Sequence, residues 1–282
     1  MHAVRRIAVA VPLLLLATIA SADEPKPPES KEAKPPVTTA TTTEEAKPAS
    51  ASSSSNAAVT YTTAEGKTMK CREQTAQSFL VRGNWFPRTN DADKVKAARK
   101  LLEDAIKYRT EKYGYFEGFG SKNGNPNPPK HYAKPVSFMG MTAQVHEKII
   151  PALKCVEAAL KASGAANEYH PHAMGGIRFK NTYKGVEVSN HVYGIAIDIE
   201  PDKNTCCGCV APWNENPVCK DKAKTTVWQR MAMPKSWVDQ FERFGFYWLG
   251  HDVLQDTMHF EFLGDPDKIV DSSGAAVAAS SP

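Results

Sequence analysis

Apolar residues recur at helical spacing in three stretches of the chain. One helix is expected over residues 91–113, and a second over residues 142–163, where Pro151 should kink the helix or separate its first turn because proline has no amide hydrogen. A third should begin at Ser236, whose hydroxyl can cap the first turn. The apolar positions of the three stripes are Val95, Ala98, Leu102 and Ala105; Val145, Ile149, Leu153, Val156 and Leu160; and Trp237, Phe241 and Phe244.

Short segments rich in β-branched and aromatic residues predict strands, mostly in the second half of the chain. The expected strands cover residues 176–179, 186–188, 194–199, 246–249 and 258–263. Because the long helical stretches come first and most strands follow, the fold class is predicted to be α+β, with a small sheet behind the helices.

Two of these strands contain polar side chains on one face. In the strand at 194–199 the isoleucines share one face and Asp198 points from the other, and in the last strand His259 and Glu261 point outward together. His191 lies seven residues before Asp198. Each residue alone is more often structural than functional. Together, two imidazoles and one carboxylate are the ligand set of a catalytic zinc, with a fourth position for water.

The two ends of the chain differ from the middle in composition. Residues 1–22 contain a basic pair, an apolar stretch too short to span a membrane and a small-residue cleavage site, which is typical of a secretory signal peptide. Residues 23–60 and 271–282 are rich in small and polar residues and contain too few large apolar residues to form a core. We expect a disordered linker and a disordered tail on either side of one domain, residues 61–270.

The charge balance narrows the choice of partners. The formal charge of the 282 residues is +4, and it falls to +2 without Arg5 and Arg6 of the signal. No dense basic stripe indicates nucleic acid as a partner, and no second apolar stretch indicates stable insertion into a membrane. We expect an exported monomer.

All six cysteines fall within the expected domain: Cys71, Cys155, Cys206, Cys207, Cys209 and Cys219. An even number behind a secretion signal favours disulfides, although six cysteines allow fifteen pairings. The four cysteines at 206–219 could alternatively form a tetrathiolate zinc site.

Two motifs together resemble a known family. The segment Ser189-Asn-His191-Val-Tyr-Gly194-Ile-Ala196-Ile-Asp198 fits S-x-H-x-x-G-x-A-x-D at every fixed position, and Asp256-Thr-Met-His259-Phe-Glu261-Phe follows about sixty residues later. Over residues 139–263 the sequence resembles the D-alanyl-D-alanine carboxypeptidase family of zinc peptidases, which includes vancomycin-resistance D,D-carboxypeptidases and phage L-alanyl-D-glutamate endolysins. The resemblance implies a hedgehog/D,D-peptidase-like fold, in which helices flank a small, mostly antiparallel sheet that holds zinc (Zn2+).

The resemblance also implies roles for individual residues. His191, Asp198 and His259 would be the zinc ligands. Asp256 would take a proton from zinc-bound water and return it to the leaving amine. Many relatives have glutamate at this place, and the alternative for Asp256 is a residue that caps a loop.

Arg178 lies where the family has an arginine that contacts the substrate carbonyl oxygen, and it would help to stabilise the oxyanion, although an exposed salt bridge is the alternative. Ser189 resembles a substrate-side serine, or it only holds its own turn. Glu261 is expected to support the site or the fold. We expect the remaining nearby histidines to be rim or packing residues, namely His170, His172 and His251. The cysteine-rich insertion after Asp198 departs from the minimal family pattern and is expected to shape the mouth of the cleft.

The activity implied by the resemblance is hydrolysis of the peptidoglycan stem peptide, in the periplasm or at the cell wall. The bond could be the D-Ala-D-Ala terminus or an internal one, and the wall could be the cell's own or a foreign one. Two alternatives remain open at this stage. A catalytically inactive zinc-binding wall module would need the three ligands but neither Asp256 nor Arg178, and a disulfide-stapled wall-binding protein would need no metal ligands.

Overall fold

The structure is a computed structural model that describes residues 58–183 and 187–271. The described residues belong to one compact unit. The expected signal peptide, nearly all of the expected linker, and the tail after residue 271 lie outside the described residues. The first strand begins at Thr60 and the last ends at Asp271, each one residue beyond the expected limits of the domain.

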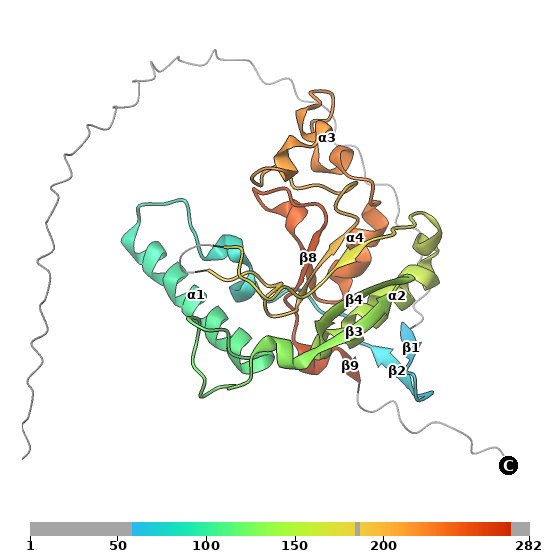
Figure 1. The fold of residues 1–282 in the computed structure, drawn as a ribbon, viewed down its shortest axis with the longest axis horizontal. Coiled ribbons are helices and arrows are strands. Elements are labelled where there is room, and N and C mark those ends of the chain that lie inside the picture. The colour runs from blue at the N-terminus through green and yellow to red at the C-terminus, as the bar shows by residue number, and fades with distance from the viewer. Residues whose placement is uncertain (1–57, 184–186, 272–282) are drawn as a thin grey trace, which may run out of the picture. The chain divides into compact units, whose positions relative to one another are not determined.

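The fold is α+β, as predicted, and is drawn in Figure 1. The helices are α1 (Ala92–Tyr113), α2 (Ile150–Ser163), α3 (Pro217–Lys220) and α4 (Lys235–Arg243). The strands are β1 (Thr60–Thr62), β2 (Thr68–Cys71), β3 (Ala133–Phe138), β4 (Met141–His146), β5 (Met174–Gly175), β6 (Ala196–Ile199), β7 (Phe246–Trp248), β8 (His259–Phe262) and β9 (Val270–Asp271).

Three small antiparallel sheets organise the described residues. The largest has the strand order β5-β6-β8-β7, the second has the order β1-β2-β9, and β3 and β4 form a hairpin. In the largest sheet the polar strands are direct neighbours, and Asp198 on β6 is paired with His259 on β8. Paired residues on neighbouring antiparallel strands point to the same face, so the pairing brings these two side chains together.

Helix α1 agrees closely with the sequence prediction. The Asp91 carboxylate caps its first turn by accepting hydrogen bonds from the amides of Asp93 and Lys94, and Gly114 follows its last residue. Val95, however, is 46% exposed and lies outside the buried stripe. The buried positions continue instead through Ala105 to Arg109, Thr110 and Tyr113.

The helix predicted over residues 142–163 is shorter than expected, so this prediction is wrong in its first part. Residues 141–146 form β4, which pairs with β3 along its whole length, and a 3-10 turn at residues 147–149 precedes α2. Pro151 lies in the first turn of α2. Backbone amides in this turn have no hydrogen-bond acceptor within the helix, so proline breaks no helical hydrogen bond there. The apolar residue Val145 is buried as predicted, but on a strand.

The start of the third helix also differs from the prediction. Helix α4 begins at Lys235, and Pro234 occupies the cap position. The Ser236 hydroxyl instead donates a hydrogen bond to Glu168, at 2.5 Å from Oε2. The buried face is as predicted, since Trp237 and Phe241 are fully buried.

Two predicted strands are not formed as expected. Residues 176–179 have no strand structure, and β5 ends just before them at Gly175. Their amides bond to different segments, Ile177 to the Gln144 carbonyl at 2.8 Å and Arg178 to the His191 carbonyl at 2.9 Å, so they cannot continue one ladder. Residues 187 and 188 are not in a strand either, and residue 186 lies outside the described residues.

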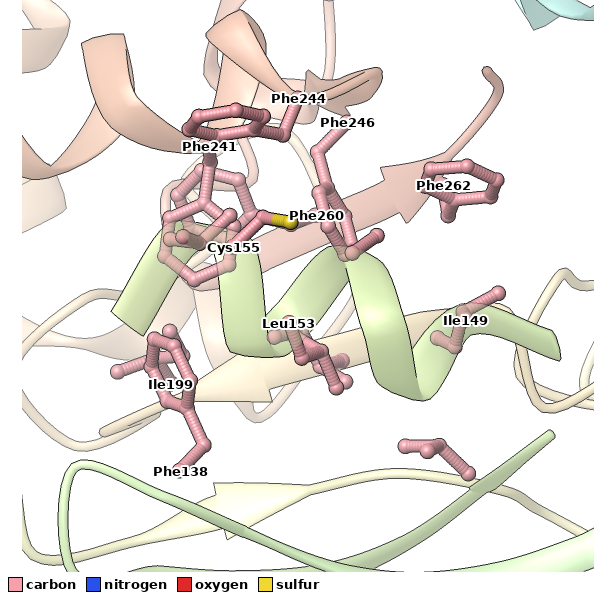
Figure 2. Close-up of a cluster of buried hydrophobic side chains, with 14 of the residues drawn as sticks. Phe138, Ile149, Leu153, Cys155, Ile199, Phe241, Phe244, Phe246, Phe260 and Phe262 are labelled. Carbon is pink, nitrogen blue, oxygen red and sulfur yellow. The ribbon is translucent and has the colours of Figure 1, made fainter. Parts of the chain in front are cut away.

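The core lies between α2, α4 and the apolar face of the largest sheet. Figure 2 shows aromatic side chains of α4, β7 and β8 gathered around α2, among them Phe241, Phe246 and Phe260. The Phe241 and Phe260 rings stack with centroids 4.2 Å apart. This packing covers the apolar face of the largest sheet and holds its strands in place, and the polar residues project from the opposite face.

All six cysteines form disulfides, as predicted. The pairs are Cys71–Cys155, Cys206–Cys209 and Cys207–Cys219. The tetrathiolate alternative is therefore wrong, because disulfide sulfurs are not thiolate ligands. Among the described residues, no helix has the length and apolar character needed to cross a membrane.

Candidate metal centre

The polar face of the largest sheet is buried, whereas the alternation pattern predicted that it points outward. Asp198 is 6% exposed, His259 4% and Glu261 3%. Part of the cover comes from α1, where the buried guanidinium of Arg109 donates hydrogen bonds to the Val188 carbonyl at 3.1 Å and to Asn190 Oδ1 at 3.0 Å. The site is therefore shielded from solvent on the side that faces α1.

His191 reaches the site from a tight turn before β6. The Gly194 amide donates to the His191 carbonyl at 3.0 Å, and Gly194 has φ +69°, a conformation that side chains disfavour. A Cβ at Gly194 would also lie 2.8 Å from the amide nitrogen of His146. The glycine of the S-x-H-x-x-G-x-A-x-D motif is therefore needed to turn the chain from the His191 loop into the strand that holds Asp198.

The three predicted ligands converge on one point. His191 Nε2 lies 3.1 Å from His259 Nδ1 and 3.2 Å from Asp198 Oδ2, and His259 Nδ1 lies 2.9 Å from Asp198 Oδ1. One ligand atom from each residue lies within 4.8 Å of the other two. This spacing suits a single metal ion with two nitrogen ligands and one oxygen ligand.

Neighbouring acceptors orient both imidazoles. His191 Nδ1 lies 2.7 Å from the Gly176 carbonyl, and His259 Nε2 lies 3.0 Å from Glu261 Oε1. When these nitrogens donate their hydrogens, the lone pairs of His191 Nε2 and His259 Nδ1 are directed towards Asp198. An imidazole whose other nitrogen is held by a carboxylate or carbonyl is the usual arrangement around a protein-bound metal.

The carboxylates favour positive charge at this point. Burial opposes charge on His259, but Asp198 and Glu261 outweigh it and raise its pKa to about 10. Burial by itself would raise the pKa of Asp198, yet the contacts of its carboxylate with His191 and His259 hold it well below its usual range. Burial lowers the pKa of His191, so this imidazole stays neutral. A site with these preferences can bind a cation through Asp198 and a neutral histidine.

Asp256 lies in the same cleft as the three ligands but makes different contacts. Its Oδ1 is buried and has no hydrogen-bond partner among the described residues. Burial raises the pKa of Asp256 to about 6. Oδ1 thus takes no part in capping the loop, and the carboxyl group can exchange a proton near neutral pH.

Arg178 reaches the site from the segment after β5. Its guanidinium forms an ion pair with Asp198 Oδ2, and its side chain is 42% exposed. Arg178 also lines both the cleft and a neighbouring cavity of about 700 Å³. It therefore combines the two possibilities that the sequence left open, a salt bridge and a position beside the cleft.

The cleft itself has a volume of about 620 Å³. Ser189 lines it, but its hydroxyl also accepts a hydrogen bond from the His191 amide at 3.3 Å and thereby holds the turn. The cysteine-rich insertion forms part of the wall through Cys206, Gly208, Cys209, Val210 and Trp213. The insertion therefore lies at the cleft, where the sequence predicted it.

The supporting residues were largely missed by sequence reasoning. Arg109 continues the stripe of Ala98, Leu102 and Ala105 at helical spacing, and a charge in that stripe could have indicated a buried polar partner. No sequence pattern indicated that the Gly176 carbonyl would lie beside His191 Nδ1. The other nearby histidines have no place in the site, because His170 and His172 line a separate cavity and His251 binds Glu242 at 2.9 Å.

Two histidines and a carboxylate lie around one point, held by the largest sheet and by the turn before β6. The protein is therefore an α+β protein with a candidate site for a single metal ion. Comparison with known families is more specific. Residues 183–262 match the model of a family described as D-alanyl-D-alanine carboxypeptidase. The match confirms the family resemblance drawn from the two motifs and supports peptidase activity. No curated protein and no solved structure was found to match the chain.

Proposed function

We propose that this protein is a zinc-dependent peptidase that hydrolyses peptidoglycan stem peptides. The observation that supports it most directly is the convergence of His191 Nε2, Asp198 and His259 Nδ1, with the other nitrogen of each imidazole held by a carbonyl or carboxylate oxygen. Two imidazoles and a carboxylate fit zinc, which prefers nitrogen and oxygen ligands in catalytic sites.

The three ligands would hold zinc and leave room in the cleft for water and substrate. Zinc supplies a Lewis acid that lowers the pKa of water and polarises a carbonyl group. Glu261 keeps His259 in the required tautomer by accepting its Nε2 hydrogen. A cation at this point would compete with Arg178 for the Asp198 carboxylate.

Asp256 is the proposed general base and then general acid. Its ionised carboxylate accepts a proton from the attacking water and returns it to the leaving amine. Arg178 is the proposed donor to the oxyanion of the tetrahedral intermediate, because a guanidinium keeps its charge and donates several hydrogen bonds. Ser189 is proposed to contact the substrate from the cleft wall.

The proposed substrate is a D-Ala-D-Ala terminus or a related bond of the stem peptide. The family match supports a substrate of the peptidoglycan type. Disulfides are consistent with an exported protein. We propose export by a signal peptide at residues 1–22, a linker at 23–60, a domain at 61–270 that works as a monomer, and a tail at 271–282.

The second candidate is a zinc-binding wall module without catalysis. It would retain the ligands but has no need for a carboxyl group with a raised pKa in the same cleft. Asp256 has this property, so we favour the enzyme.

Metal analysis and digestion of muropeptides test the proposal. We expect about one zinc per chain in the purified protein, and we expect His191→Ala to lose it, since one of the three protein ligands is removed. Mass spectrometry of digested muropeptides would show which bond is cut. If the wild type and His191→Ala both lack zinc after zinc is added, the zinc site is contradicted. If the wild type binds zinc but cleaves no muropeptide, the binding module is favoured.

A further inference from the structure

The beginning of the cysteine-rich insertion lies along the loop that contains Asp256. Thr257 donates from its amide and its hydroxyl to the Thr205 carbonyl, at 3.1 and 2.9 Å, and the Gly208 amide donates to the Leu254 carbonyl at 2.7 Å. Between these contacts, Cys206 and Asp256 form an antiparallel bridge. Segment 205–209 and segment 254–257 are therefore joined by backbone hydrogen bonds on either side of Asp256.

The Cys206–Cys209 disulfide lies close to the carboxyl group of Asp256. Both sulfur atoms and one carboxylate oxygen of Asp256 lie within 4.8 Å of one another. Cys206 is fully buried, and both cysteines line the cleft. The disulfide is thus a wall of the cleft at the position of Asp256.

Gly208 permits segment 205–209 to lie close to the backbone of Leu254. A Cβ at Gly208 would lie 2.5 Å from the Leu254 carbonyl oxygen, a distance that such contacts do not reach. The disulfide closes a loop of four residues, from 206 to 209, around this glycine. The loop is short and closed, so it can hold a fixed position against the backbone beside Asp256.

We propose that the Cys206–Cys209 disulfide is a positioning element that holds Asp256 in place for proton transfer. This inference depends on the proposed role of Asp256 as general base. Oδ1 of Asp256 has no hydrogen-bond partner in the described part of the chain. The location of the carboxyl group therefore depends on its own backbone and on the groups around it, of which the disulfide, within 4.8 Å, is one.

The second disulfide of the insertion provides a matched control. Cys207 and Cys219 belong to the same insertion, but neither is among the residues that line the cleft. Replacing Cys206 and Cys209 by alanine should lower kcat by about tenfold to a hundredfold, because a small displacement of a proton-transfer group has effects of this size. KM should stay within about twofold, and zinc content should be unchanged. Cys207→Ala/Cys219→Ala should keep kcat within about twofold.

A double-mutant cycle distinguishes positioning from general destabilisation. In an Asp256→Asn background, removing the Cys206–Cys209 disulfide should change kcat by less than about twofold, since the group on which it acts is already absent. The same loss in both backgrounds, or no loss in the wild-type background, would overturn the inference. A wild-type protein that cleaves no muropeptide would instead contradict the proposed function.

Gly208→Ala tests the same contact without removing a cysteine. The added Cβ should push segment 205–209 away from Leu254 and lower kcat, while thiol titration still finds no free thiol. If the cysteine variant does not fold, this variant and its own cycle with Asp256→Asn decide the question. The inference would be overturned if Gly208→Ala kept full activity and its effect on kcat were the same in the wild-type and Asp256→Asn backgrounds.

Discussion

Asp198 and Asp256 show how surroundings give one type of side chain two chemistries. Asp198 lies between two imidazoles, and its contacts with them keep its pKa well below the usual range, so it stays ionised and can bind a cation. Asp256 is buried beside a disulfide, and its pKa rises to about 6. The two carboxyl groups therefore suit different roles, one as a ligand and the other as an acid and base.

Substitution of Asp256 by asparagine separates catalysis from metal binding. An amide has nearly the same size as the carboxyl group but cannot accept the proton of water. We expect the rate of stem-peptide cleavage to fall by roughly two to four orders of magnitude, with zinc retained and only a modest change in stability. Steady-state kinetics and metal analysis of the same preparation measure both effects. Near-wild-type turnover would remove Asp256 from the mechanism and make Glu261 the candidate base.

At the scale of elements, His146 joins the end of β4 to the turn that holds the site. Its amide donates to the Gly194 carbonyl at 2.8 Å, and its ring contacts Tyr113 and Tyr132 with centroids 5.2 and 5.1 Å apart. Its Nδ1 accepts a hydrogen bond from the Lys148 amide at 3.1 Å. The ring must be neutral to accept this bond, so the junction between these elements depends on an uncharged histidine.

This dependence predicts a loss of stability in acid. Burial lowers the pKa of His146 to about 4, so between about pH 6.5 and pH 4 the unfolded chain binds a proton that the folded chain excludes. The contribution of His146 to the free energy of unfolding should therefore decrease as pH falls through this range and then level off. The total contribution is about 3 kcal/mol from the difference in pKa.

Denaturant unfolding at several pH values measures the effect. The control is His146→Phe, which keeps an aromatic ring but cannot take up a proton. The difference in free energy between the wild type and this variant should change by about 3 kcal/mol from pH 6.5 to pH 4. A constant difference across this range would show that His146 does not titrate as the structure indicates.

At the scale of the whole molecule, the two ends of the described chain are brought together. Strand β2 pairs with β1 and with β9, so segments from the start and the end of the domain share one sheet. Cys71 at the end of β2 is bonded to Cys155 in the middle of α2. This disulfide connects the terminal sheet to the helix at the centre of the core.

Removal of this disulfide should lower stability more than activity. The bonded cysteines are 84 residues apart, and a long loop that is closed in the unfolded state loses much conformational entropy. We expect Cys71→Ala/Cys155→Ala to lose about 2–5 kcal/mol of unfolding free energy and to retain the zinc content and kcat of the wild type. Equilibrium unfolding in denaturant would measure the loss. A change below about 0.5 kcal/mol would show that the sheet and helix are held by packing alone.

The sequence predicted those features that depend on local spacing. The α+β class, the limits of α1 and the apolar faces of α2 and α4 follow from periodicity. The candidate ligands His191, Asp198 and His259 were predicted from two short motifs, and the role of Asp256 was predicted from the family resemblance of the same motifs. The structure brings these four residues into one cleft.

Only the tertiary structure decided the rest, because the deciding contacts lie far apart in the sequence. Residues 142–146 have an apolar pattern compatible with a helix, but pairing with β3 makes them a strand. The cysteine pairing, the Gly176 carbonyl on His191 and the disulfide beside Asp256 each depend on segments joined by folding. The sequence by itself determined which side chains are candidates for binding a metal and for transferring a proton. The packing of distant segments determined which nitrogen of each histidine is available and how deeply each carboxylate is buried, since tautomer and pKa depend on neighbours in space.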